Sequence, residues 1–358
     1  MKAMNLLVKI LAVGLAVSLA STASAQSIAK PSENEFFLDR PDSTKYAVIL
    51  VGPTVGNENK SRFRQWAFSL HDILARDYGY SSDTISLLYD RGVIEGDATQ
   101  RVDAACDLAG IQQELARLQS LVKLGDQITI YLIGHGSGAE EESKFNIVGP
   151  DITGVQFSGM LDVFDQQDMI IVNTTSASYG FSASLSNEGR VVVSSTRSSS
   201  EKFDPVFSNY FIEALDNRKG DRDKNKRVSI LEAFNYAKNS VEEFYEEQGR
   251  LASEHAGLDD NGDALFSLNP NTAEIDGRLA EIAYIDNLLD DTQGLSAEAI
   301  LLKSRMQDLE RSVFMLRGRK TEFLEKDYWQ QLEELLVDLA RATGKFNDVV
   351  NSGESSGQ

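Results

Sequence analysis

Short runs of apolar and β-branched residues recur along the middle of the chain. They span 46–51, 84–89, 127–133, 168–172 and 190–194. Helical patterns follow at 60–77, 99–122 (with Thr99 as a candidate N-cap), 204–216 and 229–249. Strands that are apolar throughout are typical of a parallel sheet that helices cover on both faces. The alternation therefore predicts an α/β domain over residues 45–270, with a mostly parallel sheet sandwiched by helices.

The sequence pattern changes after residue 270, where the strand-like runs stop. Apolar residues then repeat at spacings of three and four, at positions 302, 306, 309, 313 and 316 and again at 328, 332, 335 and 339. This spacing is typical of a coiled coil or a helical hairpin. We expect an α-helical extension over 271–345, which could also pair with a second copy as a homodimer. A polar, disordered tail is predicted over 346–358.

The first residues have the pattern of a signal peptide. Lys2 and Lys9 supply a basic n-region, residues 6–19 form an apolar h-region, and Ala23-Ser24-Ala25 forms a small-residue cleavage site. We expect cleavage after Ala25 and export of the mature chain to the periplasm or the medium. The segment has no stop-transfer pattern after it, so no membrane span is predicted. Residues 26–44 are predicted to form a polar leader.

The chain is strongly acidic, with a formal net charge of −20 that becomes −22 when a signal peptide with two lysines is removed. Such a surface repels the phosphates of nucleic acids and anionic lipids, so both are poor candidates for partners, and no nucleic-acid partner is expected. It would suit divalent cations or basic partners, or serve solubility alone. Cys106 is the single cysteine, so no intramolecular disulfide can form.

Two of the predicted strands end in residues that could carry chemistry. In open α/β sheets, ligands bind beyond the carboxyl ends of the strands. His135 follows the third strand between two glycines, which would let a substrate backbone approach closely. The fourth strand runs into hydroxyl-rich residues over 173–178. A tight turn with an incidental histidine is the alternative interpretation.

A strand that ends in His-Gly, followed by one that ends in Cys-x-Ser-Gly, is the layout of caspase/legumain-like cysteine peptidases. Ile133-Gly134-His135-Gly136 matches the histidine motif, and residues 171–180 take the place of the cysteine motif. Over residues 45–250 the chain therefore resembles this clan (clan CD), and most closely bacterial members of peptidase family C13 with a helical end. The resemblance implies a caspase–hemoglobinase fold, a His–Cys dyad and cleavage after a specific side chain.

The cysteine that the resemblance implies is replaced by a hydroxyl. The motif places Ser176 at the nucleophile position, or Thr175 in an alignment one residue shorter, and Ser178 is a further hydroxyl. A serine needs a well-placed general base, and the resemblance implies a histidine that no buried acid holds. We expect a pseudopeptidase that binds a peptide or protein. An active peptidase with a His135–Ser176 dyad is the alternative.

The resemblance also implies where a substrate would be bound. Part of the specificity pocket is expected after the fifth strand, where Arg197 could pair with an acidic side chain or be an ordinary surface arginine. Gly136, beside the histidine, is the second candidate for substrate binding.

Residues 221–232 fit the spacing of an EF-hand calcium loop. Oxygen donors fall at loop positions one, three, five, nine and twelve, which are Asp221, Asp223, Asn225, Ser229 and Glu232. Lys226 replaces the glycine that usually makes the turn at position six. The spacing predicts a Ca²⁺ site, with a solvated loop as the alternative. A Ca²⁺-stabilised assembly protein that acts through its coiled coil is the third candidate function.

Overall fold

The structure is a computed structural model, and it describes residues 36–38, 43–92, 94, 100–271, 276–287 and 295–354. All of these residues belong to one unit, Pro31–Gln358. The predicted signal peptide and most of the predicted leader lie outside the described residues. Within the described ranges, none of the helices has the length and apolar character needed to cross a membrane.

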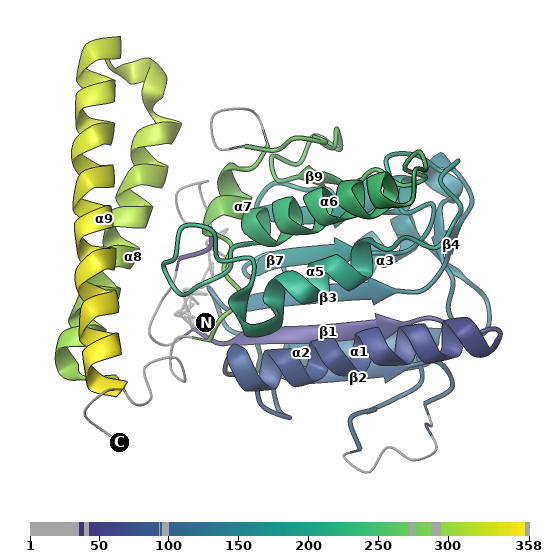
Figure 1. The fold of residues 1–358 in the computed structure, drawn as a ribbon. Coiled ribbons are helices and arrows are strands. Elements are labelled where there is room, and N and C mark those ends of the chain that lie inside the picture. The colour runs from purple at the N-terminus through teal and green to yellow at the C-terminus, as the bar shows by residue number, and fades with distance from the viewer. Residues whose placement is uncertain are drawn as a thin grey trace, which may run out of the picture. The chain divides into compact units, whose positions relative to one another are not determined.

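A central sheet of six strands, counted over the described residues, has the order β2-β1-β3-β7-β8-β9 (Figure 1). The strands are β1 (Lys45–Val51), β2 (Ile85–Tyr89), β3 (Gln127–Ile133), β7 (Asp168–Asn173), β8 (Arg190–Ser194) and β9 (Gly257–Asp259). Neighbouring strands are parallel except for β8 and β9, which are antiparallel. The predicted α/β fold with a mostly parallel sheet is therefore confirmed, and β9 is an addition.

Helices cover both faces of this sheet (Figure 1). One face packs against α1 (Asn57–Asp77), α5 (Phe207–Leu215) and α6 (Ile230–Glu247), and the other against α2 (Leu108–Leu121), α3 (Gly154–Leu161) and α4 (Tyr179–Ala183). Successive side chains of a strand point to opposite faces. Ile49 of β1 accordingly belongs to the apolar core on the face of α1, α5 and α6, and Leu50 to the core on the face of α2, α3 and α4.

Helix α2 begins later than the sequence pattern predicts. Asp107 is its N-cap, because the carboxylate accepts a hydrogen bond of 2.7 Å from the backbone N–H of Gly110. The residues before it are extended, and the N–H of Asp103 donates to the carbonyl of Leu87 in β2 at 2.9 Å. Pairing with a strand is incompatible with a helix there. The expected N-cap, Thr99, lies outside the described residues.

A small antiparallel sheet follows the end of β3. It consists of β4 (Gly136–Ser137), β5 (Lys144–Phe145) and β6 (Ile152–Thr153), with the short helix η2 (Glu140–Glu142) between β4 and β5. The N–H of Asn146 donates to the carbonyl of His135 at 3.0 Å. The backbone of His135 is thereby fixed from both sides, by β3 and by this sheet.

The C-terminal region divides differently from the prediction. Helix α7 (Arg278–Ile282) and Ile285 belong to the core of the α/β domain, which therefore extends past residue 270. Helices α8 (Ala297–Gly318) and α9 (Glu325–Glu354) pack against each other, joined through η4 (Lys320–Glu322), as the helical periodicity predicts. Helix α9 continues beyond residue 345 because Phe346 is buried against α8.

Candidate functional site

His135 and the hydroxyl-rich loop 174–178 come together because their strands are neighbours. Strands β3 and β7 are parallel, with Leu132 opposite Asn173, so the chain leaves both at the same edge of the sheet. The N–H and hydroxyl of Thr174 both donate to the carbonyl of Leu132, at 3.0 and 2.8 Å. The loop is therefore tied to the strand that carries the histidine.

The imidazole of His135 has a partner on each nitrogen. Nδ1 lies 2.9 Å from Oδ1 of Asp204, in the segment before α5, and Nε2 lies 3.2 Å from Nδ2 of Asn59 in α1. Phe63 packs edge-on against the ring, with 5.3 Å between the ring centroids. The ring is partly exposed, at 28% of its side chain. The position and orientation of the histidine ring are thus fixed by α1 and by the segment before α5.

These contacts also define the tautomer of His135. Arg62 donates to Oδ1 of Asn59 at 2.8 Å, so the NH₂ group of Asn59 must face the histidine. Nε2 therefore accepts a hydrogen bond, and Nδ1 carries the proton and donates it to Asp204. A neutral imidazole with its lone pair on Nε2 is the form that a general base needs.

Asp204 is the acid that holds this histidine, and it also forms an ion pair with Arg62. Burial alone would raise the pKa of the Asp204 carboxyl, but the hydrogen bond with His135 and the charge of Arg62 outweigh burial and lower it. Asp204 is therefore ionised at neutral pH. The expectation of a histidine without an acid partner is wrong, because a loop residue distant in sequence reaches its ring.

The candidate nucleophiles are buried and hydrogen-bonded elsewhere. Ser176 is 3% exposed, and its Oγ accepts a long hydrogen bond of 3.4 Å from the N–H of Gly136. Thr175 donates its hydroxyl to Oδ1 of Asn173 at 2.8 Å. Among the described residues, no hydrogen bond joins the ring of His135 to the hydroxyl of Thr175, Ser176 or Ser178.

Ser178 is part of a buried group of hydroxyls. Its Oγ lies 2.8 Å from that of Ser194, 3.2 Å from that of Ser195 and 2.9 Å from Oγ1 of Thr196. Ser195 in turn donates to the carbonyl of Thr175 at 2.8 Å. These bonds fix the 174–178 loop against the end of β8.

The two candidate substrate-binding residues lie on opposite sides of this loop. A Cβ at Gly136 would come within 2.2 Å of the carbonyl oxygen of Ser176, so this glycine allows β4 to pack against the loop. Arg197 is half exposed, and its Nε lies 3.4 Å from Glu201, which also contacts His255 Nδ1 at 2.6 Å. A role in substrate binding stays a prediction for both residues.

The loop 221–232 forms a second candidate centre, between η3 (Asp216–Arg218) and α6. Asp221, Asp223 and Glu232 each present a carboxylate oxygen, and these oxygens lie within 4.8 Å of one another. Lys226 has a φ of 69°, so the turn at position six exists although a lysine takes the place of glycine. Carboxylate oxygens at this spacing fit a hard divalent cation such as Ca²⁺.

The other two predicted ligands already have structural roles. Ser229 and Glu232 form the capping box of α6, with 3.2 Å from the N–H of Glu232 to the Ser229 hydroxyl. Oδ1 of Asn225 accepts from the N–H of Arg227 at 2.8 Å. A bound cation would have to share or replace these contacts.

Ionisation of two carboxylates in this loop is disfavoured by their surroundings. Burial of the carboxylate, followed by the charge of Glu232, raises the pKa of Asp223 to about 7, although the residue as a whole is exposed. Burial also raises the pKa of Glu232, against several hydrogen bonds that lower it. A cation bound among these groups would favour their ionised forms.

Several residues of these centres were not among the predicted ones. Asn59, Arg62 and Asp204 surround His135, and Glu310 of α8 accepts a hydrogen bond of 2.9 Å from Nδ2 of Asn225. An isolated acid in a loop and an acid on a charged helix face have no local pattern that distinguishes them. Only the tertiary fold brings them to their sites.

No protein-family model matches this chain, and no curated protein sequence matches it. Among solved structures, the crystal structure of the Drosophila initiator caspase Dronc is similar with a TM-score of 0.38 and 9% sequence identity. The alignment covers 75% of this chain and 99% of the caspase chain.

Proposed function

We propose that this protein is an exported, caspase/legumain (C13)-like pseudopeptidase that binds a peptide or protein at the carboxyl edge of its sheet. One observation carries the proposal. The Nε2 lone pair of His135 is directed at Asn59, while Ser176 is buried and bonded to Gly136. A hydrolase would need these two groups within hydrogen-bond reach of each other.

Exposed apolar side chains near the histidine support a binding role. Phe203, next to Asp204, and Val55, four residues before Asn59, are each 74% exposed. Large exposed apolar side chains beside a polar centre are typical of sites that bind another protein. A peptide backbone could lie along this edge, with apolar side chains against Phe203 and Val55.

Selection of peptides on the purified protein, followed by titration, tests the binding role. Phe203→Asp should weaken the selected peptides by about tenfold or more, because it removes an apolar anchor and adds a charge. The matched control is Leu124→Asp, which changes a residue 57% exposed near the amino end of β3, at the opposite edge of the sheet. Equal affinities for both variants would remove the support for this edge.

An active hydrolase is the second candidate, and the contact between His135 and Asp204 favours it. An acid that holds the proton-bearing nitrogen of a histidine keeps the other nitrogen available as a base, which is the arrangement that serine hydrolases use. Catalysis would need Asn59 to leave Nε2 and the Ser176 side chain to rotate toward it. That requirement ranks this candidate below the pseudopeptidase.

We also propose that the 221–232 loop binds Ca²⁺ and that the ion stabilises the protein. Asp221, Asp223 and Glu232 would supply the charged ligands, and Asn225 the neutral oxygen of the loop pattern. Binding at one hundred times the dissociation constant adds about 2.7 kcal/mol to the free energy of unfolding. The ion would act on stability, at the opposite edge of the sheet from His135.

Thermal unfolding in Ca²⁺ and in chelator tests this second proposal. The melting temperature should rise by roughly 5 °C with Ca²⁺. A double variant, Asp221→Asn with Glu232→Gln, should keep its fold and show no rise. An unchanged melting curve for the wild-type protein would contradict Ca²⁺ binding.

A further inference from the structure

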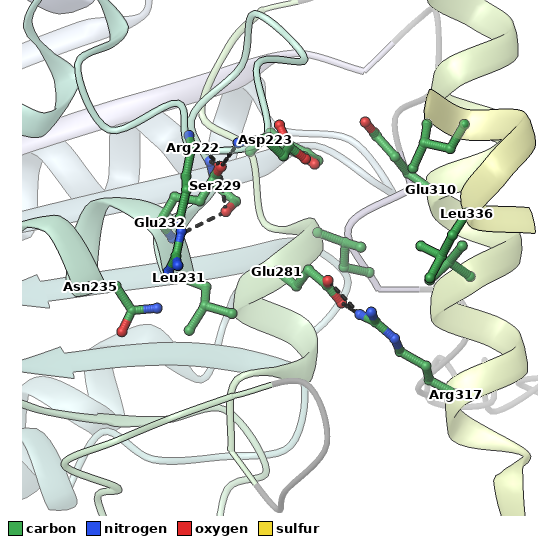
Figure 2. Close-up of a pocket in the computed structure, with 14 residues that line it drawn as sticks. Arg222, Asp223, Ser229, Leu231, Glu232, Asn235, Glu281, Glu310, Arg317 and Leu336 are labelled. Carbon is green, nitrogen blue, oxygen red and sulfur yellow. Dashed lines mark hydrogen bonds and ion pairs between the residues drawn. The ribbon is translucent and has the colours of Figure 1, made fainter. Parts of the chain in front are cut away.

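A cavity of about 480 Å³ lies between the 221–232 loop, helices α6 and α7, and the α8–α9 hairpin (Figure 2). Tyr284 lines it, and the carbonyl of this tyrosine accepts a hydrogen bond of 2.7 Å from Lys45 at the start of β1. The cavity therefore lies at the amino edge of the sheet, away from His135. Its volume falls in the range of small-molecule sites.

Part of the cavity lining is aliphatic. It comes from Leu231 and Ile282 of α6 and α7 and from Val313, Leu336 and Leu339 of the α8–α9 hairpin, and Figure 2 shows Leu231 and Leu336 on opposite sides. These side chains favour a ligand with a hydrocarbon portion, because removal of apolar surface from water stabilises the complex. An inorganic ion alone would leave them without contacts.

The remaining lining is acidic. It includes the carboxylates of Asp223, Glu232, Glu281 and Glu310 against the guanidinium groups of two arginines, a formal excess of two negative charges. Glu281 is paired with Arg317 at 2.5 and 2.6 Å. Figure 2 shows Glu310 of α8 pointing across the cavity toward Asp223. An anionic ligand would be repelled, and a cationic one attracted.

The amide of Asn225 lies between the carboxylates of Asp223 and Glu310. Nδ2 of Asn225 lies 3.3 Å from Oδ2 of Asp223, 3.2 Å from the hydroxyl of Tyr284 and 2.9 Å from Oε1 of Glu310. The two amide hydrogens match the two carboxylates, and the hydroxyl of Tyr284 has a hydrogen of its own. Each carboxylate has two oxygens with several lone pairs, so Asp223 and Glu310 can both accept from a further, positively charged donor.

We propose that this cavity binds a primary ammonium group on an aliphatic chain, either a free aliphatic diamine or a lysine side chain. The ammonium group donates to Glu310 and Asp223, since a compact cation with three donors can reach acceptors on both sides. The hydrocarbon chain lies along Val313 and Leu339. This ligand class is separate from the peptide proposed for the His135 edge.

Calorimetric titration of the purified protein in chelator tests the proposal, with 1,5-diaminopentane and N-acetyl-lysine amide as probes. Chelator is present because Asp223 belongs both to the proposed Ca²⁺ site and to this cavity. We expect at least one amine to bind, and the tighter of the two identifies the source of the ammonium group. 1-Pentanol, which has the chain without the charge, should bind at least tenfold more weakly.

Glu310→Gln should weaken the amine by about tenfold, because it replaces a charge-assisted hydrogen bond with a neutral one. Asp223→Asn provides a second test if the first variant does not fold. Glu298→Gln is the matched control, on an exposed position of the same helix about 18 Å away. Absence of binding by both amines, equal binding of pentanol, or unchanged affinity in folded Glu310→Gln and Asp223→Asn would overturn the proposal.

Discussion

A histidine that acts as a general base must direct a lone pair at the hydroxyl that it activates. In this protein the lone pair lies on Nε2, as catalysis would require, but it is directed at Asn59 at 3.2 Å. Asp204 holds the ring through Nδ1, and Arg62 holds both Asp204 and the amide of Asn59. The residues around His135 thus favour the tautomer of a general base. They direct its lone pair at Asn59, however, and not at Ser176.

Nitrogen-detected NMR of the imidazole tests this arrangement. His135 should give the signals of the tautomer protonated on Nδ1, because Asp204 accepts from that nitrogen. In Asp204→Leu, which has no acceptor, the proton should move to Nε2 in a substantial fraction of molecules. His71, which lies in α1 and has no contact to Asp204, serves as the internal control. A wild-type spectrum dominated by the Nε2-protonated tautomer would contradict the described contacts.

The sequence located His135 and the hydroxyl-rich loop because both directly follow strands with a strong apolar pattern. It could not show that Ser176 is buried, since burial depends on β4 and on the hydroxyls at the end of β8. Nor could it identify Asp204, which stands alone in a loop and contacts a residue far away in the sequence. Contacts of this kind come only from tertiary packing.

The short helix α7 is attached to the α/β domain by two buried carboxylates. Asp260 accepts from the N–H groups of Gly277 and Ala280, at 3.0 and 2.9 Å, and Asp276 accepts from the N–H of Asp260 at 3.3 Å. Burial raises the pKa of Asp260 to about 6 and that of Asp276 to about 7, and the two charges repel each other. Burial thus outweighs the N–H groups, which favour the ionised form, and ionisation of these carboxyls costs more in the folded protein than in the unfolded chain.

Removal of one of these charges should stabilise the protein in a pH-dependent way. The pKa of Asp276 is about 7 in the folded state against an ordinary value of 3.8. The folded state therefore binds more protons between these values, and the free energy of unfolding falls as pH rises through them. Asp276→Asn should raise the melting temperature by roughly 3 °C at pH 8 and have almost no effect at pH 4.

Melting curves from pH 4 to 8 measure this difference, with Glu298→Gln, an exposed carboxylate of α8, as the control. A gain that is equal at all pH values, or a loss at pH 8, would contradict the raised pKa of Asp276.

Most elements could be predicted because their patterns are local. The five predicted strands are present, and α1, α5, α6, α8 and α9 form where the helical patterns lie. Strand β9 has three residues, too few for a periodic pattern. Helix α7 falls in the predicted extension because nothing in its sequence distinguishes a helix packed on the domain from one packed on α8.

At the scale of the whole molecule, the two proposed centres lie at opposite edges of one sheet. The His135 site is formed by the carboxyl ends of β3 and β7, and the 221–232 loop lies where α5 ends and α6 begins, on the side of Lys45. Helix α8 contributes Glu310 to the second centre, so the C-terminal hairpin and the α/β domain meet there. Ligand binding at that centre can therefore affect stability while the His135 edge remains open to a partner.

Peptide hydrolysis distinguishes a pseudopeptidase from an active hydrolase. Purified wild-type protein, His135→Ala and Ser176→Ala are incubated with a diverse peptide library, and products are detected by mass spectrometry. The pseudopeptidase account predicts that the wild type yields no cleavage beyond the level of the two variants. Cleavage by the wild type that both substitutions abolish would contradict it.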